Sequence, residues 1–223
     1  MNARAILVVP GALIATAAMG QIIDDFSTGP YSITANAGSP SVEAVRVGTM
    51  MGGERDALIA YISGPLGTNA TVDSGMVQFF ASDSQTMGAL TLQYDGMDGE
   101  VENGVLNPGS NLGANMSGAN AFLFDFRFVN AGIASSMQVM TTVVTATGTF
   151  SDTVAVPEGT NVMVAQPFSS FGAADFSDVR RVEFTFSGPA ATDFTLRSIG
   201  LQTIPGPSAA LPFLIGLLGR RRR

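Results

Sequence analysis

Hydrophobic and polar residues alternate most regularly between residues 121 and 130. Phenylalanine occupies every second position from Phe122 to Phe128, and Asp125 and Arg127 fall between the rings. Successive side chains of a β-strand point to opposite faces, so this pattern predicts a strand that packs one face against a core. We expect all four rings, Phe128 included, to face inward.

A second strand is predicted at residues 182–186, where Val182, Phe184 and Phe186 alternate with polar residues. Seven further segments are rich in β-branched and aromatic residues and are separated by Gly, Asn, Asp and Pro, which favours short antiparallel strands. These segments are residues 22–26, 57–62, 75–80, 89–94, 137–145, 161–165 and 193–201.

Three long loops are predicted at residues 28–41, 95–119 and 166–178. Residues 95–119 contain glycines and an Asn-Pro-Gly step at intervals too short for a regular element. Consecutive strands without helical segments between them predict an all-β fold. We expect an antiparallel β-sandwich over residues 21–203, with a jelly roll as the first choice among sandwiches.

The N-terminus has the pattern of a secretory signal peptide. Arg4 supplies a positive charge, residues 5–18 are apolar, and Ala18-Met19-Gly20 is a small-x-small cleavage site. We therefore expect a signal helix in residues 1–20, cleaved after Gly20 or alternatively after Ala18.

Residues 204–223 form a third unit. Their apolar stretch spans about 18 Å as a helix, which is shorter than a bilayer core of about 30 Å. The terminal arginines would hold the extreme C-terminus on the cytoplasmic side, so the segment predicts a pause in the membrane during export. Pro205 and Pro207 should keep the preceding stretch extended.

This tail resembles the PEP-CTERM sorting signal of exported bacterial proteins, which consists of a Pro-Glu-Pro motif, an apolar helix and an arginine cluster. Gly206 stands where that family has Glu. The resemblance implies an exosortase-type processing enzyme as a partner, transient membrane anchoring, and delivery to the cell surface or the extracellular exopolysaccharide or biofilm matrix. An ordinary tail anchor or a disordered basic end is the alternative. The matching residues are Pro205, Gly206, Pro207, the apolar run 209–218, and Arg220, Arg221, Arg222 and Arg223.

Composition argues against an enzyme. The chain has no histidine and no cysteine, so it lacks the usual general base, the imidazole of a serine triad, thiolate chemistry and the commonest zinc ligands. Residues 21–203 hold all eighteen acids against six arginines, a net charge of −12. Such a surface repels nucleic acid and attracts divalent cations. Glycoside hydrolases use a pair of carboxylates, and the chain contains such pairs. In so acidic a chain, however, the presence of pairs does not distinguish an enzyme from a binding protein.

Calcium is the one cofactor that the acids suggest, because it takes six to eight oxygen ligands. Asp95, Asp98 and Glu100 lie close together in the long glycine-rich loop and form a candidate calcium site, although a solvated acidic turn explains them as well.

The body also resembles galactose-binding-type jelly-roll modules. Short motifs carry the resemblance, among them Ile23-Asp24-Asp25-Phe26 at the start and residues 52–56 at a corner. It implies an acidic calcium site near the pairing of the first and last strands. By position, Asp24 or Asp25 with Asp193 would hold it.

Sugar sites usually stack pyranose rings on exposed aromatic side chains. The chain has no tryptophan and three tyrosines. Tyr31 in a predicted loop and Tyr94 at a predicted strand end are the candidate platforms.

Together these patterns predict an exported, surface-sorted, non-enzymatic β-sandwich protein that is a structural or adhesive component of the extracellular matrix. The alternative is a carbohydrate-binding module that uses the loop-side tyrosines and is stabilised by calcium. The sequence leaves open the glycan, the oligomeric state and whether the tail is cleaved.

Overall fold

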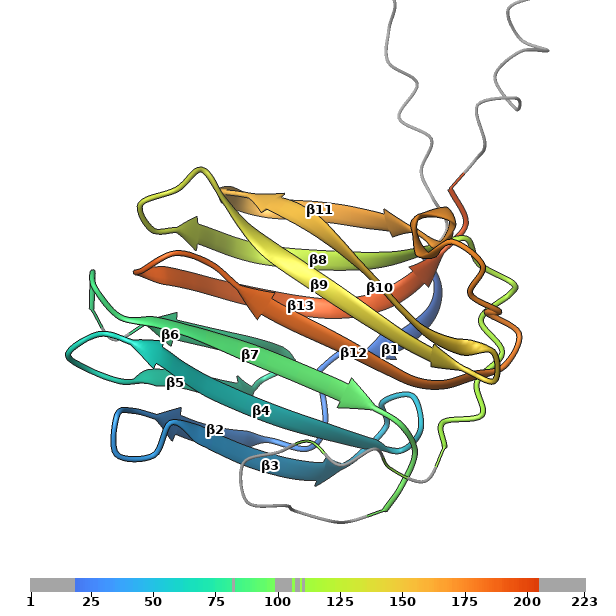
Figure 1. The fold of residues 1–223 in the computed structure, drawn as a ribbon, viewed down its shortest axis with the longest axis horizontal. Coiled ribbons are helices and arrows are strands. Elements are labelled where there is room, and N and C mark those ends of the chain that lie inside the picture. Colours follow the sequence, from blue (N-terminus) through green and yellow to red (C-terminus); the bar gives the residue numbers. More distant parts are fainter. Residues whose placement is uncertain (1–18, 82, 99–105, 107–108, 110, 205–223) are drawn as a thin grey trace, which may run out of the picture.

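A computed structural model describes residues 19–81, 83–98, 106, 109 and 111–204. The predicted signal helix before Met19 and the sorting motif of Pro205, Gly206, Pro207 and Arg220–Arg223 lie outside the described residues. The described chain forms two antiparallel sheets that stack face to face (Figure 1). The seven-stranded sheet has the order β11-β8-β13-β6-β5-β2, with β1 also paired to β13, and the six-stranded sheet has the order β10-β9-β12-β7-β4-β3.

The predicted fold class, an antiparallel β-sandwich of the jelly-roll type, is confirmed. Strands far apart in the sequence pair in a nested way, since β13 lies between β6 and β8 while β12 lies between β7 and β9. The strands are β1 (Met19–Asp24), β2 (Tyr31–Ala35), β3 (Ser41–Val47), β4 (Glu54–Ser63), β5 (Thr68–Asp73), β6 (Met76–Ala81), β7 (Met87–Tyr94), β8 (Ala121–Ala131), β9 (Ser136–Thr145), β10 (Gly148–Pro157), β11 (Gly159–Pro167), β12 (Val179–Ser187) and β13 (Thr192–Gln202).

All nine predicted strands are present, but four observed strands were missed. β2 lies inside residues 28–41, which were predicted to be a loop, so that prediction is wrong. Its five residues alternate between buried and exposed, and the Gly29-Pro30 step and Asn36 at its two ends hide so short a strand among turn signals. β3, β5 and β10 are the other three, and β3 and β10 are outermost strands of their sheet, where burial is partial.

The phenylalanine stripe forms the centre of the core, with one exception. Phe122, Phe124 and Phe126 are fully buried, whereas Phe128 is 41% exposed, so the prediction that it faces inward is wrong. Thr195 of β13 pairs with Phe128 and the next residue, Leu196, pairs with Phe126. Arg127 is therefore an extra residue, a β-bulge that reverses the alternation and turns Phe128 to the outer face of the sheet.

The predicted loop at residues 166–178 closes one end of this core. It contains a short 3-10 helix, η1 (Phe168–Phe171), which is the one helix among the described residues. Phe168 and Phe176 stack with their centroids 3.7 Å apart, and both rings pack against Phe122. No helix in the described part of the chain is long and apolar enough to cross a membrane.

A buried ion pair joins the two sheets. Arg55 of β4 is 0% exposed, and its Nη1 donates to Asp24 Oδ2 of β1 at 2.6 Å. The Tyr94 hydroxyl of β7 donates to the same carboxylate oxygen at 2.8 Å. The guanidinium also donates to the Gly29 carbonyl at 2.5 Å and lies over the ring of Phe26 at 5.4 Å. The two opposite charges thus face each other inside the sandwich, and the guanidinium Nε is left without a hydrogen bond.

Removing one partner of this pair should be strongly destabilising. We expect Asp24→Asn to lower the free energy of unfolding by about 3–5 kcal/mol, because Arg55 would keep its charge without a counterion in the core. Urea denaturation measures the change. The matched control is Asp125→Asn, which breaks the partly exposed Arg197–Asp125 pair (3.2 Å) and should cost less than about 1 kcal/mol. Equal effects of the two substitutions would contradict this account.

Candidate functional site

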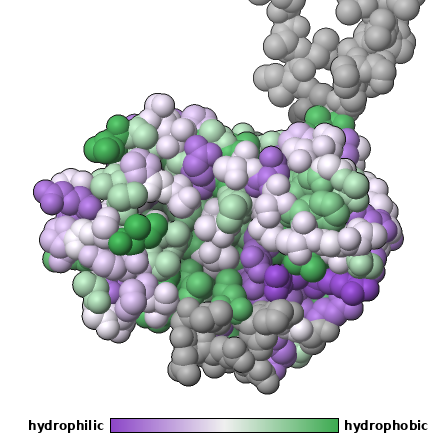
Figure 2. Space-filling view, viewed as in Figure 1, coloured by the Kyte–Doolittle hydropathy of each residue, from purple (hydrophilic) through white to green (hydrophobic). Residues whose placement is uncertain are grey.

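An acidic cluster lies where β4 begins and β7 ends. Glu54 and Asp56 are two residues apart on β4, so their side chains share one face, while Arg55 between them points into the sandwich. The face that they share is the outer face of the six-stranded sheet, where Asp56 pairs with Gln93 of β7. The most hydrophilic patch in the view of Figure 2 lies around the end of β7 and the start of β12.

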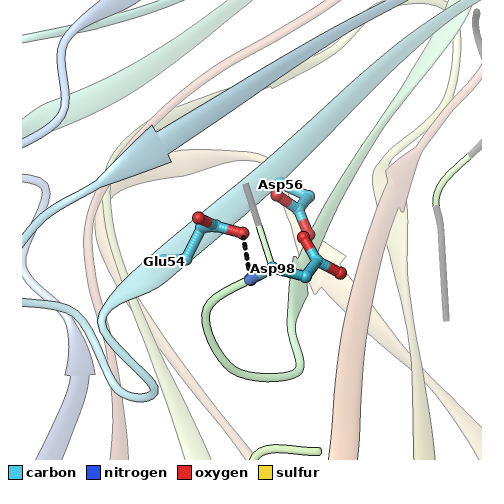
Figure 3. Close-up of side chains that lie close together, drawn as sticks. All are labelled: Glu54, Asp56 and Asp98. Carbon is cyan, nitrogen blue, oxygen red and sulfur yellow. Dashed lines mark hydrogen bonds between the residues drawn. The ribbon is translucent and has the colours of Figure 1, made fainter. Parts of the chain in front are cut away.

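The chain that follows β7 folds back over these acids. It brings Asp98 to β4, so that carboxylate oxygens of Glu54, Asp56 and Asp98 lie within 4.8 Å of one another (Figure 3). The Asp98 backbone N–H donates to Glu54 Oε1 at 3.3 Å. Asp95 is buried beside the three and accepts a hydrogen bond from Gln93 Nε2.

Gly109 holds the far side of this loop against the cluster. A Cβ at this position would lie 2.0 Å from Asp95 Oδ2, and the backbone φ of 52° is in the left-handed region. Only glycine meets both demands. Nearby, the Asn111 N–H donates to the Asp95 carbonyl at 2.8 Å, which continues the path of the loop over the sheet.

Burial and nearby negative charges raise the pKa of two acids here, Asp56 and Asp95. Burial, with the charges of Asp95, Glu54, Asp98 and Glu43 after it, raises the pKa of Asp56 to about 8. Burial also raises the pKa of Asp95 to about 6, although the Gln93 hydrogen bond and Arg181 oppose this. Burial and the neighbouring acids therefore disfavour the charged form of both carboxyls.

The structure brings together only part of the predicted calcium ligands. Asp98 lies in the cluster, Asp95 is buried beside it, and Glu100 lies outside the described residues. The pairing of Asp24 or Asp25 with Asp193 is wrong. Asp24 pairs with Ile199 of β13, six residues and therefore about 20 Å from Asp193. Moreover, the Asp24 carboxylate already accepts hydrogen bonds from Arg55 and Tyr94. Asp25 is exposed, and its carboxylate accepts a hydrogen bond from the Ser27 hydroxyl.

Sequence reasoning missed Glu54 and Asp56 as candidates for this site. A signal was available, because acids at positions i and i+2 of a strand lie on one face. The sequence could not show that this face is covered by the loop after β7, since the two segments are about forty residues apart and meet only through the pairing of β4 with β7.

The predicted tyrosine platforms are also corrected. Tyr31 is 5% and Tyr94 0% exposed, so neither ring has a free face to stack on a sugar. Both are held in the core around Arg55, whose guanidinium lies 5.4 Å from the Tyr31 ring centroid. Burial raises the pKa of both hydroxyls above the ordinary value, so they stay neutral.

Two phenylalanines, in contrast to the tyrosines, have exposed rings. Phe80 of β6 and Phe128 of β8 are each 41% exposed on the outer face of the seven-stranded sheet. β13 runs between them and pairs with both strands, with Asp193 opposite Phe80 and Thr195 opposite Phe128. We call this surface the phenylalanine face.

Hydrogen-bonding side chains surround the two rings in two rows. Residues that pair directly across strands share a face of the sheet, so the pairing places each row. The first row is Thr34, Asn69, Phe80, Asp193 and Asn130, and the second is Ser32, Thr71, Gln78, Thr195 and Phe128. Asp193 is held in place because its Oδ1 accepts from the Ala81 N–H at 3.0 Å.

A hollow of about 200 Å³ lies at another place, between the start of β1 and the end of β13. It carries no charged side chain among its lining residues, which are Gly20, Gln21, Asn115, Met116, Gly118, Ala119, Leu201 and Thr203. It offers few chemical groups for recognition.

No family model matches this chain, and no curated protein matches it. Solved structures with a similar fold exist. A family 11 carbohydrate-binding module of a Clostridium thermocellum cellulosomal cellulase is 14% identical with a TM-score of 0.40, covering 86% of this chain and 99% of the module. An exo-beta-agarase is 10% identical with a TM-score of 0.44, covering 86% of this chain and 26% of the agarase.

A third similar structure is a family 28 carbohydrate-binding module specific for non-crystalline cellulose, at 10% identity and a TM-score of 0.32, covering 66% of this chain and 80% of the module. At these identities and TM-scores the likenesses do not establish what this chain binds.

The acidic cluster predicts how stability depends on pH in metal-free buffer. Because the pKa of Asp56 is raised to about 8 in the folded protein, the folded state keeps a proton that the unfolded chain releases near pH 4. The proton on Asp56 therefore makes its full contribution to the free energy of unfolding below pH 4. This contribution is lost as the pH rises to about 8.

The contribution of Asp56 can be measured by comparing the melting temperatures of the wild type and of Asp56→Asn from pH 4 to pH 8. The buffer should contain a chelator to remove metal ions. We expect the melting temperature of the wild type, relative to that of the variant, to fall steadily from pH 4 to pH 8. A constant difference would show that Asp56 titrates normally.

Proposed function

We propose that the described domain is a carbohydrate-binding β-sandwich module and that the phenylalanine face is its binding surface. The observation that carries the proposal is the pair of half-exposed rings, Phe80 and Phe128, set among amide, hydroxyl and carboxylate side chains. Aromatic faces pack against the apolar faces of sugar rings, while side chains of the Asn, Gln, Thr and Asp type hydrogen-bond to sugar hydroxyls.

The spacing of the rings predicts the size of the ligand. Phe80 and Phe128 are two strands apart, about 10 Å across the sheet, and one row apart, about 7 Å along it, so they are separated by about 12 Å. One sugar cannot contact both rings. The ligand that fits is an extended oligosaccharide or polysaccharide that lies across β6, β13 and β8.

We further propose that the domain binds without hydrolysing its ligand. On the phenylalanine face, Asp193 is the carboxylate beside the rings, and it pairs across the strands with Asn130 and Phe80 rather than with a second acid. Hydrolysis of a glycosidic bond normally requires two carboxyl groups that flank it. Binding to a polysaccharide would make the protein an adhesive component of an extracellular matrix.

Substitution of either ring should weaken oligosaccharide binding. We expect Phe80→Ala and Phe128→Ala each to raise the dissociation constant about tenfold or more, because each loses the apolar surface that the sugar would cover. Screening the full chain against an array of soluble oligosaccharides identifies a ligand, and calorimetry with that ligand gives the constants. Its monosaccharide units should bind far more weakly.

The matched control is Met140→Ala. Met140 is 42% exposed on the outer face of the six-stranded sheet, so its loss removes similar apolar surface at a different place. Binding that survives both phenylalanine substitutions, or that Met140→Ala reduces equally, would exclude the phenylalanine face as the site.

We also propose that the protein is exported and that its mature form begins at Met19. Support comes from β1, whose pairing with β13 starts at Met19 opposite Gln202. Cleavage after Gly20 would remove two residues from this strand, whereas cleavage after Ala18 leaves it whole. Gly20 also has a packing reason to be small, since a Cβ there would lie 2.7 Å from the Leu201 carbonyl oxygen.

The intact mass of the protein recovered from the surface and medium of its native cells tests both ends. We expect an N-terminus at Met19 and, if the tail is a sorting signal, a C-terminus near residues 205–208. A mass that includes Arg220–Arg223 would contradict processing of the tail, and one that includes Met1 would contradict export by a cleaved signal peptide.

A further inference from the structure

We propose that Glu54, Asp56 and Asp98 bind a calcium ion that fastens the loop after β7 to the outer face of the six-stranded sheet. The site does not depend on carbohydrate binding, because the acidic cluster and the phenylalanine face belong to different sheets.

The decisive observation is a buried carboxylate oxygen without a partner. Asp56 is 3% exposed, and its Oδ1 is buried and accepts no hydrogen bond. The Asp56 carboxylate points toward Asp98, into the space between the three acids (Figure 3). An unsatisfied buried polar atom is destabilising, and more so when it is charged, so native structures rarely leave one without a hydrogen-bond partner or an ion.

The geometry suits one ion. Calcium binds carboxylate oxygens at about 2.4 Å, so two ligands on opposite sides of it are about 4.8 Å apart. Carboxylate oxygens of the three residues all lie within 4.8 Å of one another, and all three can therefore reach the same ion. The remaining calcium ligands can be carbonyl oxygens or water.

The surroundings of the three acids are negatively charged. Besides Glu54 and Asp98 of the cluster, the charges of Glu43 and Asp95 also act on Asp56. Arg181 is the cation that acts on Asp95, but its Nε already lies 3.0 Å from Glu183 Oε1. A hard cation with oxygen ligands would offset the repulsion among these carboxylates.

Calcium should therefore stabilise the folded protein. We expect calcium chloride at about 100 times the dissociation constant to raise the melting temperature of the full chain by about 5 °C or more. Asp56→Asn and Asp98→Asn should each abolish most of this shift. Asp56→Asn suits the test because it keeps the shape of the side chain and removes the charge that burial disfavours.

The control variant is Asp178→Asn, which removes an acid from an exposed pair with Arg180 and should leave the calcium shift unchanged. Three results would overturn the proposal. They are no shift at millimolar calcium, a shift that persists at full size in both Asp56→Asn and Asp98→Asn, and an equal shift with magnesium at the same concentration.

Discussion

The structure depends on the burial of one arginine between two sheets. Arg55 is buried away from water, and its guanidinium donates to Asp24 of β1 and to the carbonyls of Thr28 and Gly29. Tyr94 of β7 donates in turn to Asp24. Because a charge in the core is tolerated only when it is paired and hydrogen-bonded, the pair with Asp24 allows few other arrangements of these elements. The pair thereby ties β1 of one sheet to β4 of the other.

The same residue organises the acidic cluster indirectly. The alternation of a strand means that when Arg55 points into the core, its neighbours Glu54 and Asp56 must point outward. Residues 54–56 thus supply the arginine that pairs with Asp24 in the core. They also supply two of the three acids of the cluster on the opposite face of the sheet. The loop after β7 then covers these acids, which makes them a candidate site rather than a solvated patch.

Two surfaces carry the functional argument, and they lie on different sheets. The phenylalanine face exists because a bulge at Arg127 turns Phe128 outward, opposite a strand that also places Asp193 beside Phe80. The acidic cluster exists because the chain crosses over β4 after leaving β7. The cluster lies beside the chain that follows β7, whereas the phenylalanine face lies on the outer side of the seven-stranded sheet.

The sequence alone determined the class of the fold, because strand periodicity is local and the core pattern of Phe122–Phe126 and Val182–Phe186 is strong. It also determined the acidity of the body and placed Asp95 and Asp98 in one loop. Only the tertiary structure decided that Tyr31 and Tyr94 are buried, that Phe128 is exposed and that Glu54 and Asp56 meet Asp98. These outcomes depend on a one-residue bulge and on pairings between distant strands, and neither leaves a periodic signal in the local sequence.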